Sequence, residues 1–423
     1  MSKYRFFNAK IAQFQGCPSI LEGELHTEND RIVFVGNRAP DSTEKFDREI
    51  DCKGNLLLPG FKNAHAHTAM TFLRSHADDL PLQEWLTNQV FPYEGLLTPE
   101  DIYTLVQLGI LEYLSSGITS ALDMYFFRDA TAQACIDAGF RLVFSCVGGD
   151  AKVAEAEYNA LNNLDPLLSY RLGTHAQYTA TEEQLKALIE LAHQYKEPFC
   201  MHLHETRREV DECIGKTGMT ALGYLDSLGA FEYGGTGYHL VHMTDDDMRI
   251  MKDHNMFAVS CPCSNLKLSS GIAPLDKMGN FGIRLALGTD GAASNNALDM
   301  FREMMLASFL QKCTVGPSAG DPLKILTMAC STGAHAMYLE DCDDLAEGKL
   351  ADIIMLDLSQ PNMQPVNNIL KNVVYAGGKQ NVIMTMIAGN ILYENGVYLN
   401  GLDVESISQK SNEIIRRMEK AFE

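Results

Sequence analysis

The alternation of two kinds of segment between residue 61 and about residue 340 constrains this chain more than any other feature. Helix-like segments such as "TEEQLKALIELAHQYK", where Thr181 can cap the amino terminus, separate short apolar runs of strand character. These runs are "GITSALDMYF", "RLVFSCVGGD", "YRLGTHAQYT", "EPFCMHLHET", "GTGYHLVHMT", "MFAVSCPCSN" and "IRLALGTDGAAS". With the run that ends at His65 there are eight, which predicts an α/β fold, a (β/α)8 barrel of the TIM type.

The two ends of the chain differ from this central part. Residues 1–60 and 346–400 carry short β-type runs, such as "RIVFVG" and "EGKLADIIMLDLS", and no long amphipathic helix. We therefore predict that residues 1–60 and 346–400 pair into a small β-sandwich beside a barrel of residues 61–345. The tail, residues 401–423, has the pattern of a terminal amphipathic helix.

Composition argues against several classes of function. A net charge of −21 would repel nucleic acid, so no nucleic-acid partner is expected. No run approaches 18 apolar residues, and the start lacks a signal-peptide pattern, so no membrane partner is expected either. The eleven cysteines are scattered and odd in number, which is typical of reduced thiols in a cytoplasmic protein. A homo-oligomer is the default expectation.

Polar side chains follow nearly every predicted strand. In order along the chain they are His65 and His67, Asp123, His175, His202 with Glu205, His239 with His242, Ser264 with Asn265, and Asp290. Two histidines at i and i+2 share one face of a strand, but taken alone they also fit two ordinary buried histidines. Because the carboxyl ends of barrel strands carry the active site in this fold, the repetition predicts a functional site there.

Several of these strand-end groups are metal ligands by type, and histidines with a carboxylate suit Zn²⁺, or Fe²⁺ as a second choice. The candidates are His65, His67, His202, His239 and Asp290. The run "LGTHAQYT" has no lysine that could be carbamylated to bridge two metals. We therefore predict one metal per chain, with an open position for water.

The motifs "PGFKNAHAHTAM", "HLHET", "YHLVHMTDDD", "CPCSNLKLSSGIAP" and "LGTDGAASNN" resemble those of the amidohydrolase superfamily. More narrowly, they are similar to its 5'-methylthioadenosine/S-adenosylhomocysteine deaminases, over nearly the whole chain. The resemblance implies one set of metal ligands: His65, His67, His202 and Asp290. It further implies that Glu205 is the catalytic acid and that His239 lies beside the attacking water. It implies substrate contacts from Glu94, in "FPYEGLLTPED", to the ribose, and from His175. It gives no role to His204, His242, Trp85, Asn265 or Ser294.

The chemistry of hydrolytic deamination fits these residue types. Hydroxide must attack a ring carbon, and a bound metal lowers the pKa of water to about 7. Asp290 can accept the proton of the water, and Glu205 can protonate the ring nitrogen, as a glutamate that is not a ligand does in zinc deaminases. His239 can hold and polarise the hydroxide, and Asp290 or Glu205 can deliver a proton to the departing ammonia.

The family members that bind S-adenosylhomocysteine place arginines near the third strand and in the loop after it. Here Arg141 opens that strand, at the end away from the expected site, and the loop offers only Lys152 among acidic residues. An anionic tail would lack a bidentate partner. We therefore favour a neutral 5'-substituent, as in 5'-methylthioadenosine, 5'-deoxyadenosine or adenosine.

Two alternatives remain open at this point. The first is an aminohydrolase of another ring substrate, of guanine, pterin or triazine type, on the same scaffold. Glu94 discriminates against it, because a ribose-binding carboxylate has no purpose for a free base. The second is a barrel without enzymatic activity that serves as an interaction module, which should have lost ligands that are all present here.

Overall fold

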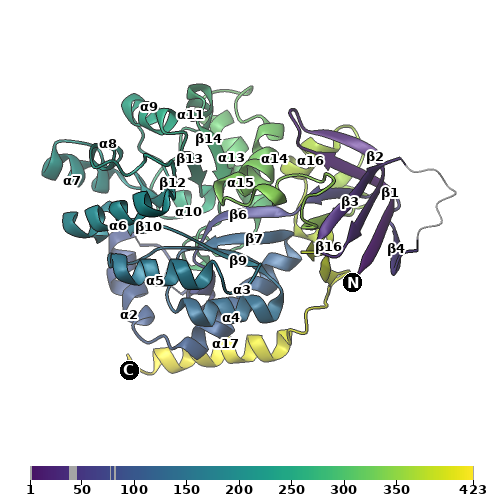
Figure 1. The fold of residues 1–423 in the computed structure, drawn as a ribbon, viewed down its shortest axis with the longest axis horizontal. Coiled ribbons are helices and arrows are strands. Elements are labelled where there is room, and N and C mark those ends of the chain that lie inside the picture. Colours follow the sequence, from purple (N-terminus) through teal and green to yellow (C-terminus); the bar gives the residue numbers. More distant parts are fainter. Residues whose placement is uncertain (1, 38–44, 77, 81, 423) are drawn as a thin grey trace.

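The computed structural model describes residues 2–37, 45–76, 78–80 and 82–422. Figure 1 shows a barrel with surrounding helices, and beside it a sheet with strands from the first 60 residues and from residues 346–400. The expected α/β class, the barrel and the pairing of the two ends are all confirmed. Within this described part of the chain, no helix is both long enough and apolar enough to cross a membrane.

The barrel strands follow one another in chain order, each parallel to its neighbours. They are β6 (Phe61–Ala66), β7 (Ile118–Asp123), β8 (Arg141–Ser145), β9 (Leu168–Arg171), β10 (Gly173–Ala176), β11 (Phe199–Leu203), β12 (Gly235–His239), β13 (Phe257–Ser260) and β14 (Arg284–Leu287). β9 and β10 are two halves of one predicted strand, "YRLGTHAQYT". The strand breaks at Gly173, where a Cβ atom would lie only 1.9 Å from the carbonyl oxygen of Cys200, so glycine is required.

The barrel closes where the chain beyond β14 meets β6. The backbone N–H of Asp290 donates to the carbonyl oxygen of His65 at 3.0 Å. One residue earlier, Thr289 and Asn63 exchange two hydrogen bonds, of 2.7 and 2.8 Å. The last predicted strand is therefore joined to the first, and this seam (residues 63–65 and 289–290) lies at the carboxyl ends of the strands.

Helices separate the strands. Around the barrel they are α1 (Leu82–Trp85), α2 (Phe91–Glu94), α3 (Pro99–Ser115), α4 (Arg128–Ala138), α5 (Ala151–Leu161), α6 (Glu182–Tyr195), α7 (Arg207–Thr217), α8 (Ala221–Ser227), α9 (Asp245–Asp253), α10 (Pro262–Lys267), α11 (Leu275–Phe281), α12 (Ala292–Asn295), α13 (Met300–Thr314), α14 (Pro322–Ala329) and α15 (Ser331–Ala336). As the sequence predicts, Thr181 caps α6, because its side chain accepts from the backbone N–H of Gln184.

The chain ends form one mixed sheet, in which nine strands are described. They are β1 (Lys3–Gln13), β2 (Ser19–Glu28), β3 (Arg31–Gly36), β4 (Arg48–Asp51), β5 (Leu56–Pro59), β15 (Ile353–Leu356), β16 (Val382–Ile387), β17 (Asn390–Glu394) and β18 (Val397–Tyr398). On β5, Leu57 packs into a core internal to this sheet, whereas Leu56 and Leu58 pack into the main core with the barrel. Both faces of β5 are therefore buried, which explains its uninterrupted apolar run.

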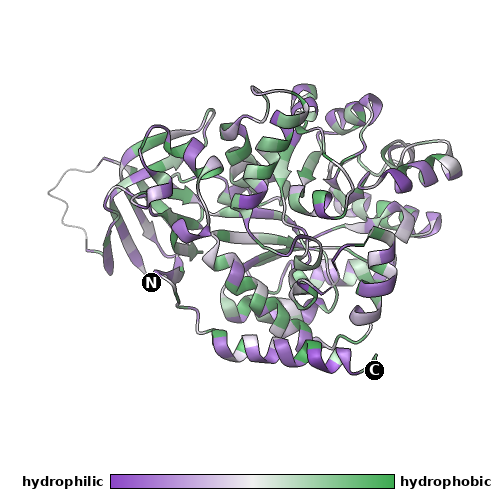
Figure 2. Cartoon of the chain, turned by 180° about the vertical axis from the view of Figure 1, so that it is seen from behind, coloured by the Kyte–Doolittle hydropathy of each residue, from purple (hydrophilic) through white to green (hydrophobic). Residues whose placement is uncertain are grey.

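Two helices follow in the carboxyl-terminal part. They are α16 (Ile369–Tyr375) and α17 (Val404–Glu419). In Figures 1 and 2, α17 lies along the outside of the barrel beneath α3 and α4, and its residues alternate between hydrophilic and hydrophobic. The barrel strands are mainly hydrophobic in Figure 2. All eleven cysteines are free thiols, as their spacing predicts.

Candidate active site

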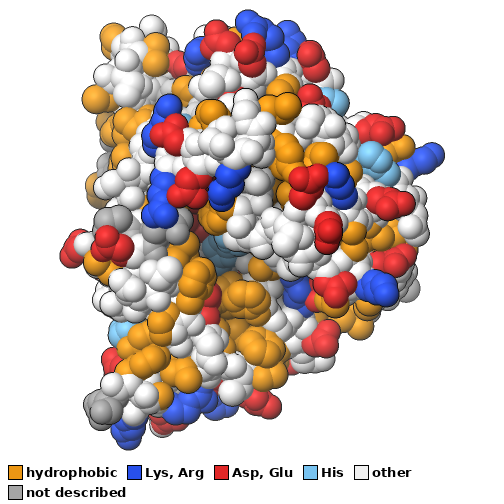
Figure 3. All heavy atoms as spheres, turned by 90° about the vertical axis from the view of Figure 1, so that its left-hand side faces the viewer, with side chains coloured by type: hydrophobic (Ala, Val, Ile, Leu, Met, Phe, Trp, Pro, Cys, Tyr) orange, Lys and Arg blue, Asp and Glu red, His pale blue; other side chains and the backbone are white. Residues whose placement is uncertain are grey.

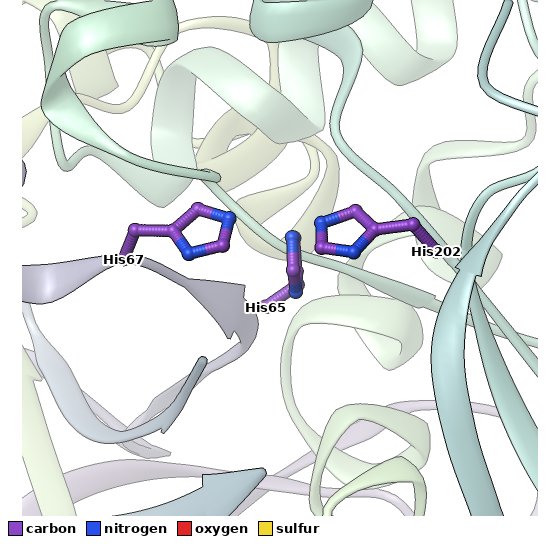
Figure 4. A group of neighbouring side chains, drawn as sticks. All are labelled: His65, His67 and His202. Atoms are coloured by element: carbon purple, nitrogen blue, oxygen red, sulfur yellow. The ribbon is translucent and has the colours of Figure 1, made fainter. Parts of the chain in front are cut away.

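The strand ends bring the predicted metal ligands together. His65 and His67 come from β6, His202 from β11, and Asp290 from the turn after β14. One ring nitrogen each of His65, His67 and His202 lies within 4.8 Å of the other two, and Figure 4 shows the ring of His65 between those of His67 and His202. One potential ligand atom each of His65, His239 and Asp290 also lies within 4.8 Å of the other two. Residues from four separate strand ends thus converge on one point.

Backbone carbonyls fix the orientation of two of these rings. Nδ1 of His67 donates to the carbonyl oxygen of Met124 at 2.6 Å, and Nδ1 of His202 donates to that of His175 at 2.7 Å. Burial lowers the pKa of His67, but contact with Asp290 outweighs this and raises the pKa to about 9, so a metal at Nε2 displaces a proton. Since a carbonyl can only accept, Nδ1 of each ring is bound within the fold and Nε2 is the nitrogen left for a metal. This is the arrangement in which protein histidines bind metals.

The ring nitrogens of His65 indicate whether the site fits a metal. Its side chain is fully buried and stacks on Tyr238 at 4.2 Å between ring centroids, yet neither ring nitrogen has a hydrogen-bond partner among the described residues. A buried polar group without a partner costs about 1–3 kcal/mol, so it requires an explanation. Burial lowers the pKa of His65 and of His202 well below 6.5, which keeps both rings neutral at pH 7. Neutral, unpaired ring nitrogens facing a carboxylate fit a divalent metal.

The two carboxylate oxygens of Asp290 have different contacts. Oδ2 accepts from the hydroxyls of Ser264 and Ser294 at 2.6 and 2.8 Å. Oδ1 lies 3.2 Å from Nε2 of His67 and 3.6 Å from Nε2 of His65. Burial opposes ionisation, but contact with His67 and the charges of the surrounding histidines hold the pKa of Asp290 well below its usual range. One oxygen is therefore anchored, and the other faces the predicted ligands.

Glu205 and His239 lie on the other side of this cluster. Their closest side-chain atoms, Oε2 and Nε2, are 4.0 Å apart, and Nδ1 of His239 donates to Oδ1 of Asn265 at 2.8 Å. Burial raises the pKa of Glu205, so its carboxyl holds a proton to higher pH than an exposed glutamate does. Burial lowers the pKa of His239, but the charges of Glu205 and Asp290 outweigh this and raise it overall.

A cavity of about 230 Å³ opens above the cluster and contains the remaining predicted residues. The lining includes Glu94, His175, Glu205, His239 and Asp290. Nδ1 of His175 is buried and has no partner among the described residues, and burial lowers the pKa of this ring to about 4. Glu94 lies on α2 and accepts a hydrogen bond of 2.7 Å from the hydroxyl of Tyr125.

The outer part of the cavity is apolar. Its exposed lining residues Phe91 and Phe126 are aromatic, and five further apolar side chains contribute to the lining: Leu82, Trp85, Leu86, Val90 and Val147. Figure 3 shows a hollow bordered by hydrophobic side chains, with histidine atoms visible inside it. None of the described lining residues is lysine or arginine. The cavity thus combines a polar floor with an uncharged mouth.

Other strand-end residues from the sequence lie outside this cavity. Asp123 accepts from the backbone N–H of Thr68, and Nε2 of His204 accepts from that of Leu222. His242 contacts the carbonyl oxygen of Ser270. These three residues have partners within the fold, so a polar residue at a strand end does not by itself mark the site.

Sequence reasoning missed Tyr125 and gave Ser264, Ser294 and Asn265 no role. Tyr125 follows the end of β7 by two residues, in the run "GITSALDMYF", so the strand-end pattern that identified His202 could have included it. The two serines contact Asp290 and Asn265 contacts His239. In each case the structure supplies the partner, which the sequence does not.

Comparison with known proteins identifies close relatives along the whole chain. Residues 56–392 match the model of the Amidohydrolase family. A 5-methylthioadenosine/S-adenosylhomocysteine deaminase of Caldanaerobacter subterraneus subsp. tengcongensis is 37% identical over 402 residues, 92% of each chain. One of Syntrophomonas wolfei subsp. wolfei is 37% identical over 425 residues, 97% of this chain and 98% of that one. The crystal structure of an adenosine deaminase from Xanthomonas campestris with bound zinc is 30% identical, with a TM-score of 0.94 and 99% of both chains covered.

Proposed function

This chain belongs to the amidohydrolase family, and from that premise we propose that it is a zinc-dependent deaminase of 5'-modified adenosines. The reaction replaces the amino group at carbon 6 of the adenine ring with oxygen and releases ammonia, giving the inosine analogue. The names of the relatives and the donor set of the site support this proposal.

The metal would be held by His65, His67, His202 and Asp290, a set of nitrogen and oxygen donors that suits Zn²⁺, with Fe²⁺ as a second choice. A divalent metal there supplies hydroxide at neutral pH, because it lowers the pKa of a bound water to about 7. The fixed ring orientations of His67 and His202 and the unpartnered ring of His65 support this assignment.

The protein's own proton transfers fall to Asp290 and Glu205. Asp290 takes a proton from the attacking water, while Ser264 and Ser294 hold its carboxylate in place through Oδ2. Glu205, whose raised pKa lets it carry a proton, donates to the ring nitrogen so that negative charge does not build up on the ring. Asp290 or Glu205 then protonates the amino group, and the carbon–nitrogen bond breaks with loss of ammonia.

His239 orients the attacking oxygen. Its Nδ1 proton is bound by Asn265, so Nε2 is the atom directed at the reaction centre. The raised pKa of this ring favours its protonated form, which donates a hydrogen bond and stabilises developing negative charge.

The position of Glu94 in the cavity is the observation that supports a ribonucleoside as the substrate. This carboxylate lines the same cavity as Glu205 and Asp290, but it comes from α2, in the long connection after β6. A ribonucleoside places an adenine at one end and vicinal hydroxyls at the other, and those hydroxyls can donate to a carboxylate. His175, with an unpartnered buried nitrogen, is the second proposed substrate contact.

The uncharged mouth supports a neutral 5'-substituent. No described lining residue offers a cation to a carboxylate tail, and aromatic side chains such as Phe91 and Phe126 surround the space instead. Arg141, the arginine nearest in sequence to the expected position, forms an ion pair of 2.7 Å with Asp352 at the amino end of β8, away from the cavity. We therefore propose 5'-methylthioadenosine, 5'-deoxyadenosine or adenosine ahead of S-adenosylhomocysteine.

A substrate panel tests the proposal. The protein reconstituted with zinc is incubated separately with adenosine, 5'-methylthioadenosine, 5'-deoxyadenosine, S-adenosylhomocysteine, guanine and a pterin, and the released ammonia is measured. We expect turnover of the first three nucleosides, with kcat/KM for S-adenosylhomocysteine below each of them. Turnover of guanine or pterin without any nucleoside would refute the proposed function. Preference for S-adenosylhomocysteine would refute the argument from the uncharged mouth.

A further inference from the structure

Tyr125 and Glu94 form a hydrogen-bonded pair between two segments of the site. The Tyr125 hydroxyl donates to Oε1 of Glu94 at 2.7 Å, from the segment after β7 to α2. Tyr125 is 4% exposed, and its ring lies 6.2 Å from that of His67 and 5.0 Å from that of Phe126. The pair therefore connects α2, which carries Glu94, with the part of the site around His67.

The hydrogen bond distinguishes the two oxygens of the Glu94 carboxylate. Among the residues that the structure describes, Tyr125 is its one side-chain hydrogen-bond partner, and that bond uses Oε1. Burial raises the pKa of Tyr125 well above 10, so the hydroxyl remains a donor throughout the working pH range. Oε2 remains available to a ligand in the cavity. The carboxylate then resembles Asp290, which has one oxygen anchored and one presented.

The backbone around Tyr125 is held at both ends. On one side, the carbonyl oxygen of Met124 accepts from Nδ1 of His67. On the other, Phe127 adopts a left-handed conformation with φ of 50°, which costs a bulky residue about 1–2 kcal/mol, before α4 begins. Strain of this kind persists where surrounding contacts determine the conformation, and it concentrates at functional sites. The segment 124–127 thus fixes a predicted metal ligand and Tyr125 together.

We propose that Tyr125 is a positioning residue that directs Glu94 toward the vicinal 2'- and 3'-hydroxyls of the substrate ribose. This inference rests on the proposed function, since it assumes a ribonucleoside in the cavity. Tyr125 acts through Glu94 and takes no part in the chemistry at the adenine ring. Loss of the Tyr125 hydroxyl should therefore weaken the binding of substrates that carry the 2'- and 3'-hydroxyls. It should not change the chemistry at the adenine ring.

The test compares two substrates that differ only in the diol. Wild type and Tyr125→Phe are assayed with adenosine and with 2',3'-dideoxyadenosine, and kcat and KM are determined separately. The variant keeps the ring and loses the donor. We expect KM for adenosine to rise about 10-fold, the usual effect of losing a hydrogen bond to a charged group, with kcat changed less than about 3-fold. The ratio of kcat/KM between adenosine and dideoxyadenosine should fall by the same factor of about 10.

Two further variants separate positioning from damage to the fold. Tyr178→Phe removes a hydroxyl from the same cavity, but no hydrogen bond joins this hydroxyl to Glu94, so the ratio between the two substrates should not change. Glu94→Gln should lower the ratio at least as much as Tyr125→Phe, and the double variant should lower it no further than Glu94→Gln alone.

The outcomes are distinct. An unchanged substrate ratio in Tyr125→Phe would overturn the inference, and so would an equal loss on both substrates, which would indicate a structural role. Absence of ammonia release by wild type from adenosine and every other nucleoside would overturn the proposed function as well. Wild-type activity on adenosine with an unaffected ratio in the variant would overturn the role of Tyr125 alone.

Discussion

Lys62 and His65 lie on the same strand, β6, and both side chains are fully buried, yet of the two only Lys62 hydrogen-bonds to other described residues. The ammonium of Lys62 donates to the carbonyl oxygen of Gly60 and to the hydroxyl of Thr119 at 2.7 and 3.0 Å. Neither ring nitrogen of His65 has a hydrogen-bond partner in the described part of the chain. The first residue belongs to the amino end of the barrel and the second to the carboxyl end.

The same difference extends to the charged pairs at the two ends. At the amino end, Asp352 accepts two bonds from Arg141 and a third from the backbone N–H of Ala388. At the carboxyl end, Asp290 directs one oxygen at Nε2 of His65 and of His67, 3.6 and 3.2 Å away, while Ser264 and Ser294 hold the other. Buried polar groups satisfied within the chain stabilise the fold, whereas those left open are available to a metal and a substrate. The following predictions test this difference.

The largest effect is expected from His65→Leu. The metal should be lost, and activity should fall roughly 10⁴-fold, because several kcal/mol of transition-state stabilisation disappear with it. The metal-free variant should nevertheless be more stable than metal-free wild type, by about 1 kcal/mol or more, since two unpartnered nitrogens leave the core. Metal analysis by mass spectrometry, ammonia release and urea unfolding measure the three quantities.

His204→Leu is the matched control for that experiment. His204 is also fully buried, but one of its nitrogens is bonded within the fold: Nε2 accepts from the backbone N–H of Leu222, and Nδ1 lies 3.7 Å from Oδ2 of Asp247. This variant should keep its metal and lose about 1–3 kcal/mol of stability. Equal metal loss in both variants, or a strong destabilisation of the metal-free protein by His65→Leu, would contradict the distinction between His65, open at both nitrogens, and His204, bonded at Nε2.

The next largest effect is expected from Glu205→Gln, which removes the proposed acid. Turnover should fall by about 10²–10⁴, the usual contribution of general acid–base catalysis, while the metal content stays at the wild-type level. Glu209→Gln is the matched control on the same segment: its carboxylate accepts from the backbone N–H of Glu205, and an amide oxygen can replace it. Near-normal turnover in Glu205→Gln would mean that the acid is another residue.

At the amino end, Asp352→Ala should destabilise the protein by about 3–5 kcal/mol, because it leaves the buried guanidinium of Arg141 unpaired. Metal content and kcat of the folded protein should not change, in contrast to His65→Leu. The double variant Arg141→Met/Asp352→Leu should recover most of the loss, since an apolar pair removes both charges. A double variant as unstable as the single one, by urea unfolding, would argue against a simple buried ion pair.

The smallest effect concerns Glu303, a buried carboxyl on α13 that accepts from the backbone N–H of Cys263 and from the side chain of Asn295. Burial raises the pKa of Glu303 to about 7 despite these bonds. The unfolded chain ionises near 4.5, so folding becomes less favourable as the pH rises from about 4.5 to about 7, by about 3 kcal/mol in all. Below that window the group is protonated in both states and has no effect.

Glu303→Gln removes this titration. The difference in apparent unfolding free energy between variant and wild type should therefore change by about 3 kcal/mol between pH 4.5 and pH 7, in favour of the variant at the higher pH. Urea midpoints measured across that range provide the check, and a difference independent of pH would show that Glu303 ionises at an ordinary pKa in the folded protein.

The histidines of the site could be predicted from the sequence because two local rules combine. Apolar runs determine where a strand ends, and parallel strands in a barrel gather their carboxyl ends, so His65, His202 and Asp290 had to meet if the fold was right. The same rules give Asp123 and His242, which turn out to be bonded within the fold. The position of a residue along a strand therefore predicts where its side chain lies, but it does not predict which groups that side chain hydrogen-bonds to.

The pairing of Tyr125 with Glu94 could not be predicted in this way. It depends on how the long connection after β6 folds back over the barrel, and no periodicity in that segment determines the path of α2. The contacts of Ser264 and Ser294 with Asp290 depend similarly on side-chain rotamers across the barrel seam. Tertiary packing determines all three.

The seam between His65 and Asp290 also determines when the site can form during synthesis. The first ligand pair leaves the ribosome with β6, whereas the last ligand follows β14, after nearly all of the barrel has been translated. A nascent chain that contains only the first four strands carries His65 and His67 without His202 or Asp290, and so lacks half of the donors. The proposed ligand set therefore predicts that metal binds late, only after the barrel has closed.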